Sequence, residues 1–359
     1  MTARPSSIPG PSSVRSIAVL RALHLGDLLC ATPALRALRR HYPHAHISLI
    51  GLPWAREFAA RYPHLLDEFI EFPGWPGVPE GPQRDDARLA AFFDEMRARR
   101  LDLAIQMHGA GDVTNAFVAE LGARTTAGFV PSPDAQPRPD VAVPYPDDVP
   151  EPRRHLALVR ALGADATDDR LEFPVADADR AALRMVPGAP ALEGRRYAVI
   201  HPGSRDPARR WPPDRFAAVA AALASDGIAV VYTGSARERG IVEAARCGVC
   251  APSLDLSGQT DLGMLAALIE GAALVVCNDT GVSHLAAAVR TPSVVVFTAS
   301  DPRRWAPANA VRHRPVLPAE RDEHGVPRGL PPLDAVVEAA FAQLALSDDG
   351  LAAAGDASL

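Results

Sequence analysis

The stretch from Ser16 to Arg40, SIAVLRALHLGDLLCATPALRALRR, decides the fold of the first part of the chain. Ser16–Leu20 is an apolar segment that predicts a buried strand, and the apolar residues after Asp27 predict a helix. The chain breaks between the two at Leu25-Gly26-Asp27. Asp27 is then either an ordinary cap of that helix or a general base that awaits a substrate.

Strand-like and helix-like segments alternate along the chain, and this alternation is typical of an α/β fold with parallel sheets. Further strands are predicted at 47–50 and 101–107 in the first half, with helices such as 84–99 between them. A second block of the same kind starts at 197–200. Its other predicted strands, separated by alanine-rich helices, are 228–233, 274–278 and 293–297.

The length of 359 residues suits two domains of about 150 residues each. We expect an N-terminal Rossmann-like domain over 14–172 and a C-terminal one over 173–332. Two such domains would face each other across a cleft at the carboxyl ends of their strands, where open α/β sheets bind ligands. The ends of the chain are expected to be a disordered leader over 1–13, a helix over 333–346 and a disordered tail over 347–359.

Composition excludes several classes of protein. The net charge of −6 argues against general binding of nucleic acids. No apolar run reaches the roughly 18 residues of a membrane span, and 1–13 has no hydrophobic region typical of a signal peptide. We therefore expect a cytoplasmic protein, with peripheral contact to the inner face of the membrane left open. The chain contains no lysine, which excludes P-loop NTPases and enzymes that use pyridoxal phosphate.

Three local patterns favour a structural role over a functional one. Cys247 and Cys250 have the spacing of zinc ligands, but no second pair follows, so no metal site is predicted. Asp177 and Asp179 match the Asp-x-Asp pattern of metal-dependent glycosyl transfer, yet they precede a helix and are interpreted as caps and solvated charge. The glycines at 109 and 111 follow a strand, but the sixth position of a dinucleotide loop is not glycine here.

In the second block, the strand at 274–278 runs into Asp279-Thr-Gly-Val-Ser-His284 and then into a helix. A turn of this kind presents free backbone N–H groups at a helix N-terminus, where the helix dipole favours an anion such as phosphate. Gly281 allows an anion to approach the backbone closely. The alternative is that Thr280 simply caps the helix, and the local pattern leaves both interpretations open.

Two more strand ends in this block carry polar groups. Ser204 and Arg209 follow the strand at 197–200 and could together hold a diphosphate, although an Arg-Arg-Trp stretch is more often surface packing of a tryptophan. Glu238 follows the strand at 228–233 and could accept hydrogen bonds from ribose hydroxyls, or could merely lie in the first turn of a helix. Since three such ends would meet at one edge of a parallel sheet, nucleotide binding is predicted.

Together these residues resemble glycosyltransferase family 9, the heptosyltransferases of lipopolysaccharide core assembly. The matching motifs are Gly26-Asp27 with TPALRAL, HPGS with RRWP, TGS with a later Glu, LSGQTDL, and NDTGVSHLAAA followed by TPSVVVF. They occur in family order from about residue 15 to 345. The resemblance implies a GT-B fold, in which the N-terminal domain takes the acceptor and the C-terminal domain binds an ADP-sugar. It also implies that the last helix crosses back to the first domain.

The resemblance implies roles for single residues as well. Asp27 becomes the catalytic base of an inverting, metal-independent glycosyl transfer, with ADP-heptose as the expected donor and no further cofactor. Arg209 takes the phosphate-binding place where family members often carry lysine. The remaining donor contacts are Ser204, Thr280, Gly281 and His284 for the diphosphate, Asp279 for the sugar, Glu238 for the ribose, and Ser257 and Gly258 near the base.

The acceptor is expected to be a lipopolysaccharide core or another glycan. Arg36, Arg39 and Arg40 would suit an anionic acceptor such as a phosphorylated glycolipid, but they suit a solvated helix face equally well. Two proline-rich stretches, 72–83 and 131–152, fall in the acceptor domain, where the family is least alike. Two other functions stay open on the same fold: a nucleotide-sugar epimerase or hydrolase, and a non-catalytic protein that binds a nucleotide-sugar.

Overall fold

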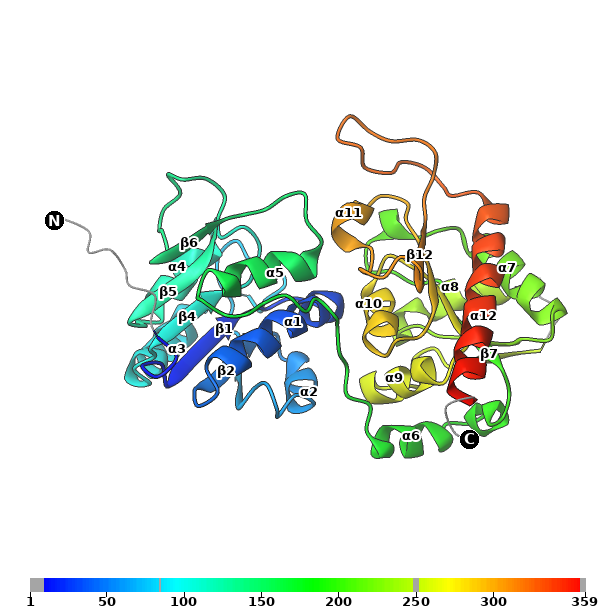
Figure 1. Cartoon of the computed structure of the whole chain (residues 1–359), viewed down its shortest axis with the longest axis horizontal. Coiled ribbons are helices and arrows are strands. Elements are labelled where there is room, and N and C mark those ends of the chain that lie inside the picture. The colour runs from blue at the N-terminus through cyan, green and yellow to red at the C-terminus, as the bar shows by residue number, and fades with distance from the viewer. Residues whose placement is uncertain (1–9, 84, 248–251, 356–359) are drawn as a thin grey trace. The chain divides into compact units, whose positions relative to one another are not determined.

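The structure, a computed structural model, describes residues 10–83, 85–247 and 252–355. The chain forms two compact units, Met1–Leu171 and Glu172–Leu359, each with its own sheet (Figure 1). The boundary lies one residue before the one expected from the sequence. The α/β fold with two parallel, Rossmann-like sheets is confirmed, since every strand pair described within the two sheets is parallel.

The first unit has a six-stranded sheet in the order β3-β2-β1-β4-β5-β6. The strands are β1 Ser16–Leu20, β2 His46–Gly51, β3 Glu68–Glu71, β4 Leu103–Gln106, β5 Thr125–Val130 and β6 Val141–Pro144. The helices are α1 Leu25–His41, α2 Ala55–Ala60, α3 Asp86–Ala98, α4 Thr114–Glu120 and α5 Glu151–Arg160. The chain adds β2 and β3 on one side of β1 and then β4, β5 and β6 on the other side. The switch point of this sheet therefore lies between β1 and β4.

The second unit repeats this topology in the order β12-β11-β10-β7-β8-β9. Its strands are β7 Tyr197–His201, β8 Ala229–Tyr232, β9 Ser253–Asp255, β10 Leu274–Asn278, β11 Ser293–Val296 and β12 His313–Val316. Its helices are α6 Asp177–Arg184, α7 Pro213–Ser225, α8 Arg239–Arg246, α9 Leu262–Glu270, α10 Gly281–Ala288, α11 Pro302–Trp305 and α12 Leu333–Gly355, with 3-10 turns at Ala189–Leu192, Pro207–Arg209 and Ala236–Glu238. The corresponding switch point lies between β7 and β10.

Each unit has its own hydrophobic core. The central strands are buried along their length, because helices cover both faces of a parallel sheet and leave no face for water. In the first unit, Trp75 of the proline-rich stretch 72–83 packs edge-on against Phe93 and Phe117, and its indole N–H donates to the Val113 carbonyl at 3.0 Å. This stretch is therefore anchored to the aromatic core and to the loop that follows β4.

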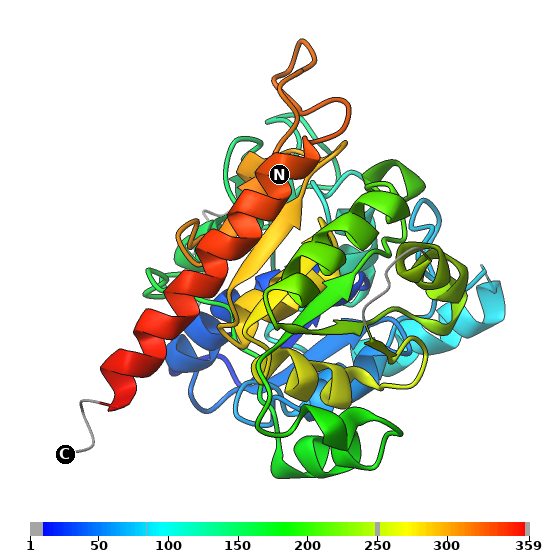
Figure 2. The ribbon, with the colours of Figure 1, turned by 90° about the vertical axis from the view of Figure 1, so that its right-hand side faces the viewer.

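The C-terminal helix α12 packs on the second unit. Figure 2 shows α12 lying along the second unit, and Val336, Ala340 and Leu344 belong to the hydrophobic core of that unit. Its neighbours include α7 and the strands β10, β11 and β12. The apolar face of this helix therefore covers the sheet of its own unit. The helix also continues to Gly355, well into the expected disordered tail, while 356–359 lie outside the described residues.

At the N-terminal end, the part of the expected leader that the structure describes forms a turn, in which the Ser13 N–H donates to the Gly10 carbonyl at 3.0 Å. The rest of that leader, 1–9, lies outside the described residues. Among the helices that the structure describes, none combines the length and the apolar character that crossing a membrane requires.

Replacement of Leu344 by alanine tests the packing of α12. The Leu344 side chain is buried, so Leu344→Ala should lower the free energy of unfolding by about 2–5 kcal/mol. Hydrogen exchange should lose protection in β10, β11 and β12. The control Glu338→Ala alters an exposed position of the same helix and should change stability by less than about 0.5 kcal/mol. Loss of protection confined to the first unit would contradict this packing.

Candidate functional site

Asp27 lies in the first turn of α1, directly after the carboxyl end of β1. One carboxylate oxygen, Oδ2, accepts a hydrogen bond from the His24 N–H at 3.2 Å, which caps the helix. The other, Oδ1, lies 3.8 Å from the Arg21 Nη2, and the side chain keeps 21% of its surface exposed. The cap interpretation therefore describes one oxygen of Asp27, and the second oxygen remains accessible for chemistry.

Arg21, which the sequence analysis missed, organises the surroundings of Asp27. Its side chain is almost fully buried, and its Nε donates to the Asp27 carbonyl at 2.6 Å. Its Nη1 donates to the Met107 carbonyl in the loop after β4, and its Nη2 lies 3.5 Å from the Glu151 carboxylate at the start of α5. Glu151 also pairs with the buried Arg154. The guanidinium thus joins four segments of the unit at the switch point, and the buried charges are mutually compensated.

The structure does not bring the three arginines proposed for the acceptor to Asp27. Arg36 pairs with Asp168 at 3.2 Å, and Arg39 bonds to Asp67 and to the Leu65 carbonyl. Arg40 is exposed. Since an α-helix rises about 1.5 Å per residue, Arg36 lies roughly 14 Å further along α1 than Asp27.

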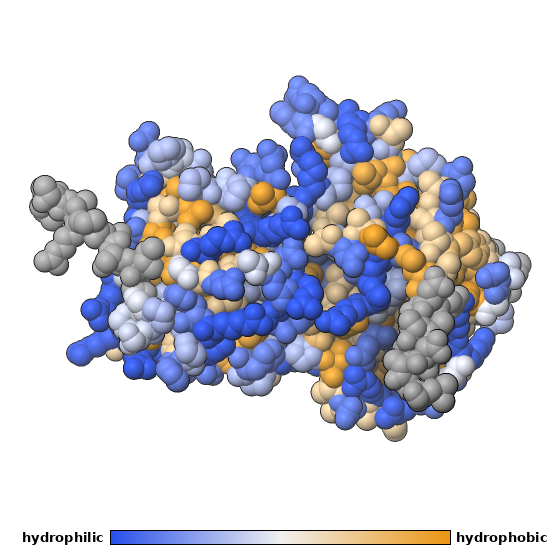
Figure 3. All heavy atoms as spheres, in the orientation of Figure 1, coloured by the Kyte–Doolittle hydropathy of each residue, from blue (hydrophilic) through white to orange (hydrophobic). Residues whose placement is uncertain are grey.

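The interactions of these arginines indicate that they belong to a structured surface. Arg36 and Arg39 hold neighbouring loops to α1, and Figure 3 shows hydrophilic side chains spread over the face of the first unit that α1 and α5 cover. Arg36 and Arg39 keep only 14% and 18% of their side-chain surface exposed, and the role of these arginines in acceptor binding stays a prediction.

In the second unit, the predicted phosphate turn leads from β10 into α10. Thr280 is the N-cap residue of this helix, but its hydroxyl makes no capping hydrogen bond. The Thr280 carbonyl instead accepts from the Ser283 hydroxyl at 2.7 Å and from the Ser283 N–H at 3.0 Å. The N–H groups of the first turn point out of the helix end, as they do in every α-helix. The turn thus has the form of an anion site at the switch point of the sheet.

Two of the predicted donor residues meet directly at this turn. Asp279 is buried, and its Oδ2 accepts from Arg209 Nη1 at 3.0 Å and from the Ser300 hydroxyl at 2.6 Å. The Arg209 guanidinium also lies 5.9 Å from the ring centre of Trp305, and the His284 ring lies 6.2 Å from the same indole. Ser300 and Trp305 were not predicted, because they come from the loop after β11 and from the short helix α11 and carry no motif of their own.

Asn278, also missed in the sequence, holds the loop that carries Ser204. Its amide Nδ2 donates to the Pro202 carbonyl at 2.8 Å, and its Oδ1 accepts from the Trp211 N–H at 2.9 Å. Ser204 is buried within this loop, and its carbonyl accepts from Arg210 Nε at 2.7 Å. One carboxamide therefore fixes both ends of the segment between β7 and α7 to the end of β10.

Glu238 approaches the same loop from the next strand end. Its Oε2 accepts from the Ser235 N–H at 2.8 Å and the Ser235 hydroxyl at 2.7 Å. A Cβ at Gly203 would lie 2.3 Å from Glu238 Oε1, so only glycine allows this approach. Burial acts to raise the pKa of Glu238, but His201 and the Ser235 hydrogen bonds hold it below its ordinary value. The carboxylate is therefore charged at neutral pH.

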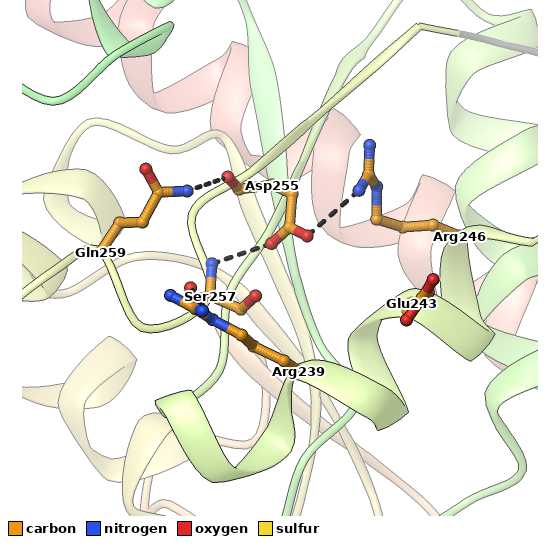
Figure 4. Close-up of a pocket in the computed structure, with 6 residues that line it drawn as sticks. All are labelled: Arg239, Glu243, Arg246, Asp255, Ser257 and Gln259. Carbon is orange, nitrogen blue, oxygen red and sulfur yellow. Dashed lines mark hydrogen bonds and ion pairs between the residues drawn. The ribbon is translucent and has the colours of Figure 1, made fainter.

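Ser257 and Gly258 follow β9, and Ser257 borders a pocket of about 450 Å³. Gly258 has φ +65°, and a Cβ there would lie 2.9 Å from the Ala236 Cα, so the loop lies close against the turn after β8. Figure 4 shows the pocket with α8 on one side and the segment after β9 on the other. Its lining residues are Arg239, Glu243, Arg246, Asp255, Ser257 and Gln259.

The described residues contain no group of three or more His, Cys, Asp and Glu side chains that could hold a metal ion. Asp179 accepts a hydrogen bond from the Ala176 N–H at 2.8 Å, and the Asp177 side chain is fully exposed, so both behave as a helix cap and solvated charge. Cys247 is described and exposed, while Cys250 lies outside the described residues.

Two doubly wound units, one of them with a helix-start turn and a paired arginine and aspartate at its switch point, define an α/β protein whose sheets offer ligand sites at their switch points. The family model of glycosyltransferase family 9 (heptosyltransferase) matches residues 89–321, and the chain belongs to this family. The protein is therefore a glycosyltransferase. The matched range includes every predicted donor residue and begins after Asp27.

Known relatives extend the match over most of the chain. Lipopolysaccharide heptosyltransferase 3 of Escherichia coli is 27% identical over 299 residues, which cover 79% of this chain and 83% of that protein. A family 9 glycosyl transferase from Veillonella parvula has a similar structure, with a TM-score of 0.76 and 20% identity over 92% of this chain and 97% of that one. The E. coli ADP-heptose lipopolysaccharide heptosyltransferase II gives a TM-score of 0.69 and 20% identity, covering 93% and 99%. This likeness shows that the chain shares the GT-B fold with these two structures.

Asn278→Leu tests how the loop between β7 and α7 is held. Removal of the amide leaves the buried Trp211 N–H and the Pro202 carbonyl without this partner, so the free energy of unfolding should fall by about 1–3 kcal/mol for each group left unpaired. Urea unfolding measures the change. Arg314→Leu, at an exposed position of β12 in the same unit, is the control and should stay within about 0.5 kcal/mol of the wild type. Equal stability of the two variants would refute the role of Asn278.

Proposed function

We propose that this glycosyltransferase is an inverting, metal-independent enzyme that moves heptose from ADP-heptose to a lipopolysaccharide-core acceptor. The observation that carries the proposal is the pairing of Arg209 with Asp279 beside the N-terminus of α10. The names of the relatives support the donor and the acceptor class, since they are lipopolysaccharide heptosyltransferases and one is named for ADP-heptose.

The donor diphosphate binds at the turn formed by Thr280, Gly281 and His284. Free N–H groups and the helix dipole favour its negative charge there. Arg209 uses one of its five N–H donors on Asp279, and others remain for phosphate oxygens, with the Ser204 loop alongside.

The rest of the donor lies along the same edge of the sheet. Glu238 keeps acceptor capacity beyond its bonds to Ser235 and binds the ribose hydroxyls. Ser257 and Gly258 lie near the base, where the pocket beyond β9 offers space. Asp279 binds the sugar, and its burial fixes the carboxylate that does so.

The chemistry uses one carboxylate as base. Asp27 takes the proton of the attacking acceptor hydroxyl through the oxygen that is not used by the helix cap. The hydroxyl oxygen bonds to the anomeric carbon of heptose from the face opposite the diphosphate, and the bond from that carbon to the diphosphate oxygen breaks. Negative charge then grows on the departing ADP, where backbone N–H groups and Arg209 stabilise it without a metal ion.

A lipopolysaccharide-core acceptor implies work at the inner face of the membrane. In relatives of this kind the acceptor is named as lipopolysaccharide, and such a substrate carries a lipid anchor and negative charge. Peripheral contact of the first unit with that membrane surface is therefore part of the proposal. A cytoplasmic location follows from it.

Nucleotide binding tests the donor. ADP at about 100 times its dissociation constant should stabilise the protein by about 2.7 kcal/mol, seen as a higher melting temperature, with EDTA present and with little response to UDP or GDP. Arg209→Met should reduce the shift, whereas Arg314→Met, at an exposed position of β12, should not. A shift that disappears on addition of EDTA argues against the metal-independent site, and a preference for UDP or GDP argues against ADP-heptose.

Asp27→Asn tests the base. The amide keeps the shape of the side chain but cannot take a proton, so transfer to deacylated, heptose-deficient core oligosaccharide should slow by about 10²–10³-fold, measured as ADP release. ADP-induced stabilisation should be unchanged. The control Asp85→Asn replaces another capping aspartate of the same unit and should retain activity. If both variants turn over at the wild-type rate, Asp27 is not the base.

A further inference from the structure

A buried imidazole beside Asp27 has no role in the chemistry described so far. We propose that His108 is an acceptor-binding residue, whose neutral imidazole holds a hydroxyl group of the acceptor sugar next to the hydroxyl that Asp27 deprotonates. The proposal rests on the proposed function, since it assumes that Asp27 is the base. It adds a sugar-binding group that comes from the loop after β4.

The topology brings His108 to Asp27. Strands β1 and β4 are parallel neighbours with Leu20 opposite Gln106, so the segments that follow them leave the sheet at the same edge. Arg21 donates to the carbonyl of Met107, the residue before His108, and also to the Asp27 carbonyl. The charges of Arg21 and Asp27 both act on the His108 ring. One guanidinium thus holds the backbone of the base and of the imidazole together.

The backbone of His108 is held rigidly from its other side. The Thr114 hydroxyl donates to the His108 carbonyl at 2.8 Å, and the Gln106 amide donates to the same carbonyl. Both partners are buried, and the Gln106 Oε1 accepts from the Phe129 N–H of β5 at 3.2 Å. Because these hydrogen bonds fix the backbone, the His108 side chain is preorganised for binding. A loop whose backbone groups make no such bonds does not hold a side chain in one place.

The imidazole itself has hydrogen-bonding capacity that the protein leaves unused. The residue is nine-tenths buried at 9% exposure, and its Nδ1 has no hydrogen-bond partner anywhere in the described part of the chain. Buried polar atoms are nearly always paired in native proteins, so an unpaired one at a candidate site indicates a missing ligand group. Sugars supply adjacent hydroxyls that both donate and accept.

The charge state of His108 makes it a hydrogen-bonding group and not a second base. Burial, and then the charge of Arg21, lowers its pKa to about 4, while Asp27 acts in the opposite direction. At neutral pH the ring is therefore uncharged, with one N–H donor and one lone pair. It can orient a sugar between two hydroxyls, whereas the proton of the attacking hydroxyl passes to the carboxylate of Asp27.

The test compares His108→Leu, which removes hydrogen bonding, with His108→Asn, which retains donor and acceptor groups. The substrates are ADP-heptose and deacylated, heptose-deficient core oligosaccharide. We expect His108→Leu to lower kcat/KM for this oligosaccharide by about three- to tenfold, His108→Asn to recover part of the loss, and ADP-induced stabilisation to stay unchanged. His46→Leu, at an exposed position where β2 begins, is the matched control and should leave kcat/KM unchanged.

Three outcomes overturn the proposal. An unchanged kcat/KM in His108→Leu excludes a binding role, and a loss of melting temperature that His108→Asn shares without recovery assigns a purely structural role. An acid limb of the pH profile that moves in His108→Asn shows that the imidazole titrates in the working range. Absence of turnover by the wild type overturns the proposed acceptor as well, which separates that failure from one confined to His108.

Discussion

In a parallel sheet that is buried on both faces, polar side chains can gather in one place only, the edge where the strands end. In both units of this protein the central strands are buried along their length, and most strands lead into a loop and then a crossover helix. The polar turns are forced to that edge, and the switch point is where neighbouring crossovers diverge and leave room. The proposed base Asp27 follows the first strand of its sheet and the turn at Thr280 follows the fourth strand of the other, so each flanks the switch point of its own sheet.

The two units hold their loops together at this edge with different buried side chains. In the first, the buried charge of Arg21 ties the loop after β4 and the start of α5 to Asp27. In the second, the neutral amide of Asn278 ties the loop after β7 to the end of β10. A buried guanidinium needs carboxylates around it, here Glu151 and Asp27, whereas a buried amide is satisfied by backbone groups alone. The first solution creates a charged catalytic environment and the second leaves the fixed charges to Arg209 and Asp279.

The sequence predicts the alternation of strands and helices, the central strands and the turns at Asp27 and Asp279, because these depend on local apolar patterns and on helix-start signals. It does not predict β3, β5, β6, β9 or β12, and all of these except β5 are short and only partly buried. The sequence does not predict the roles of Arg21 and Asn278 for another reason. Their partners lie 130 and 67 residues away, and no local pattern records such contacts. The C-terminal helix shows that an apolar face identifies a buried surface but not which sheet covers it.

The positive charge at the donor turn is a guanidinium in a chain that has no lysine at all. Chemistry directed at side-chain amines therefore has no target here. Acetylation of lysine, a common way to remove positive charge from a phosphate site, cannot silence Arg209, and amine-reactive labels cannot block it. The proposed donor site is accordingly closed to this form of regulation, and it should survive bulk acylation that would inactivate a lysine-dependent relative.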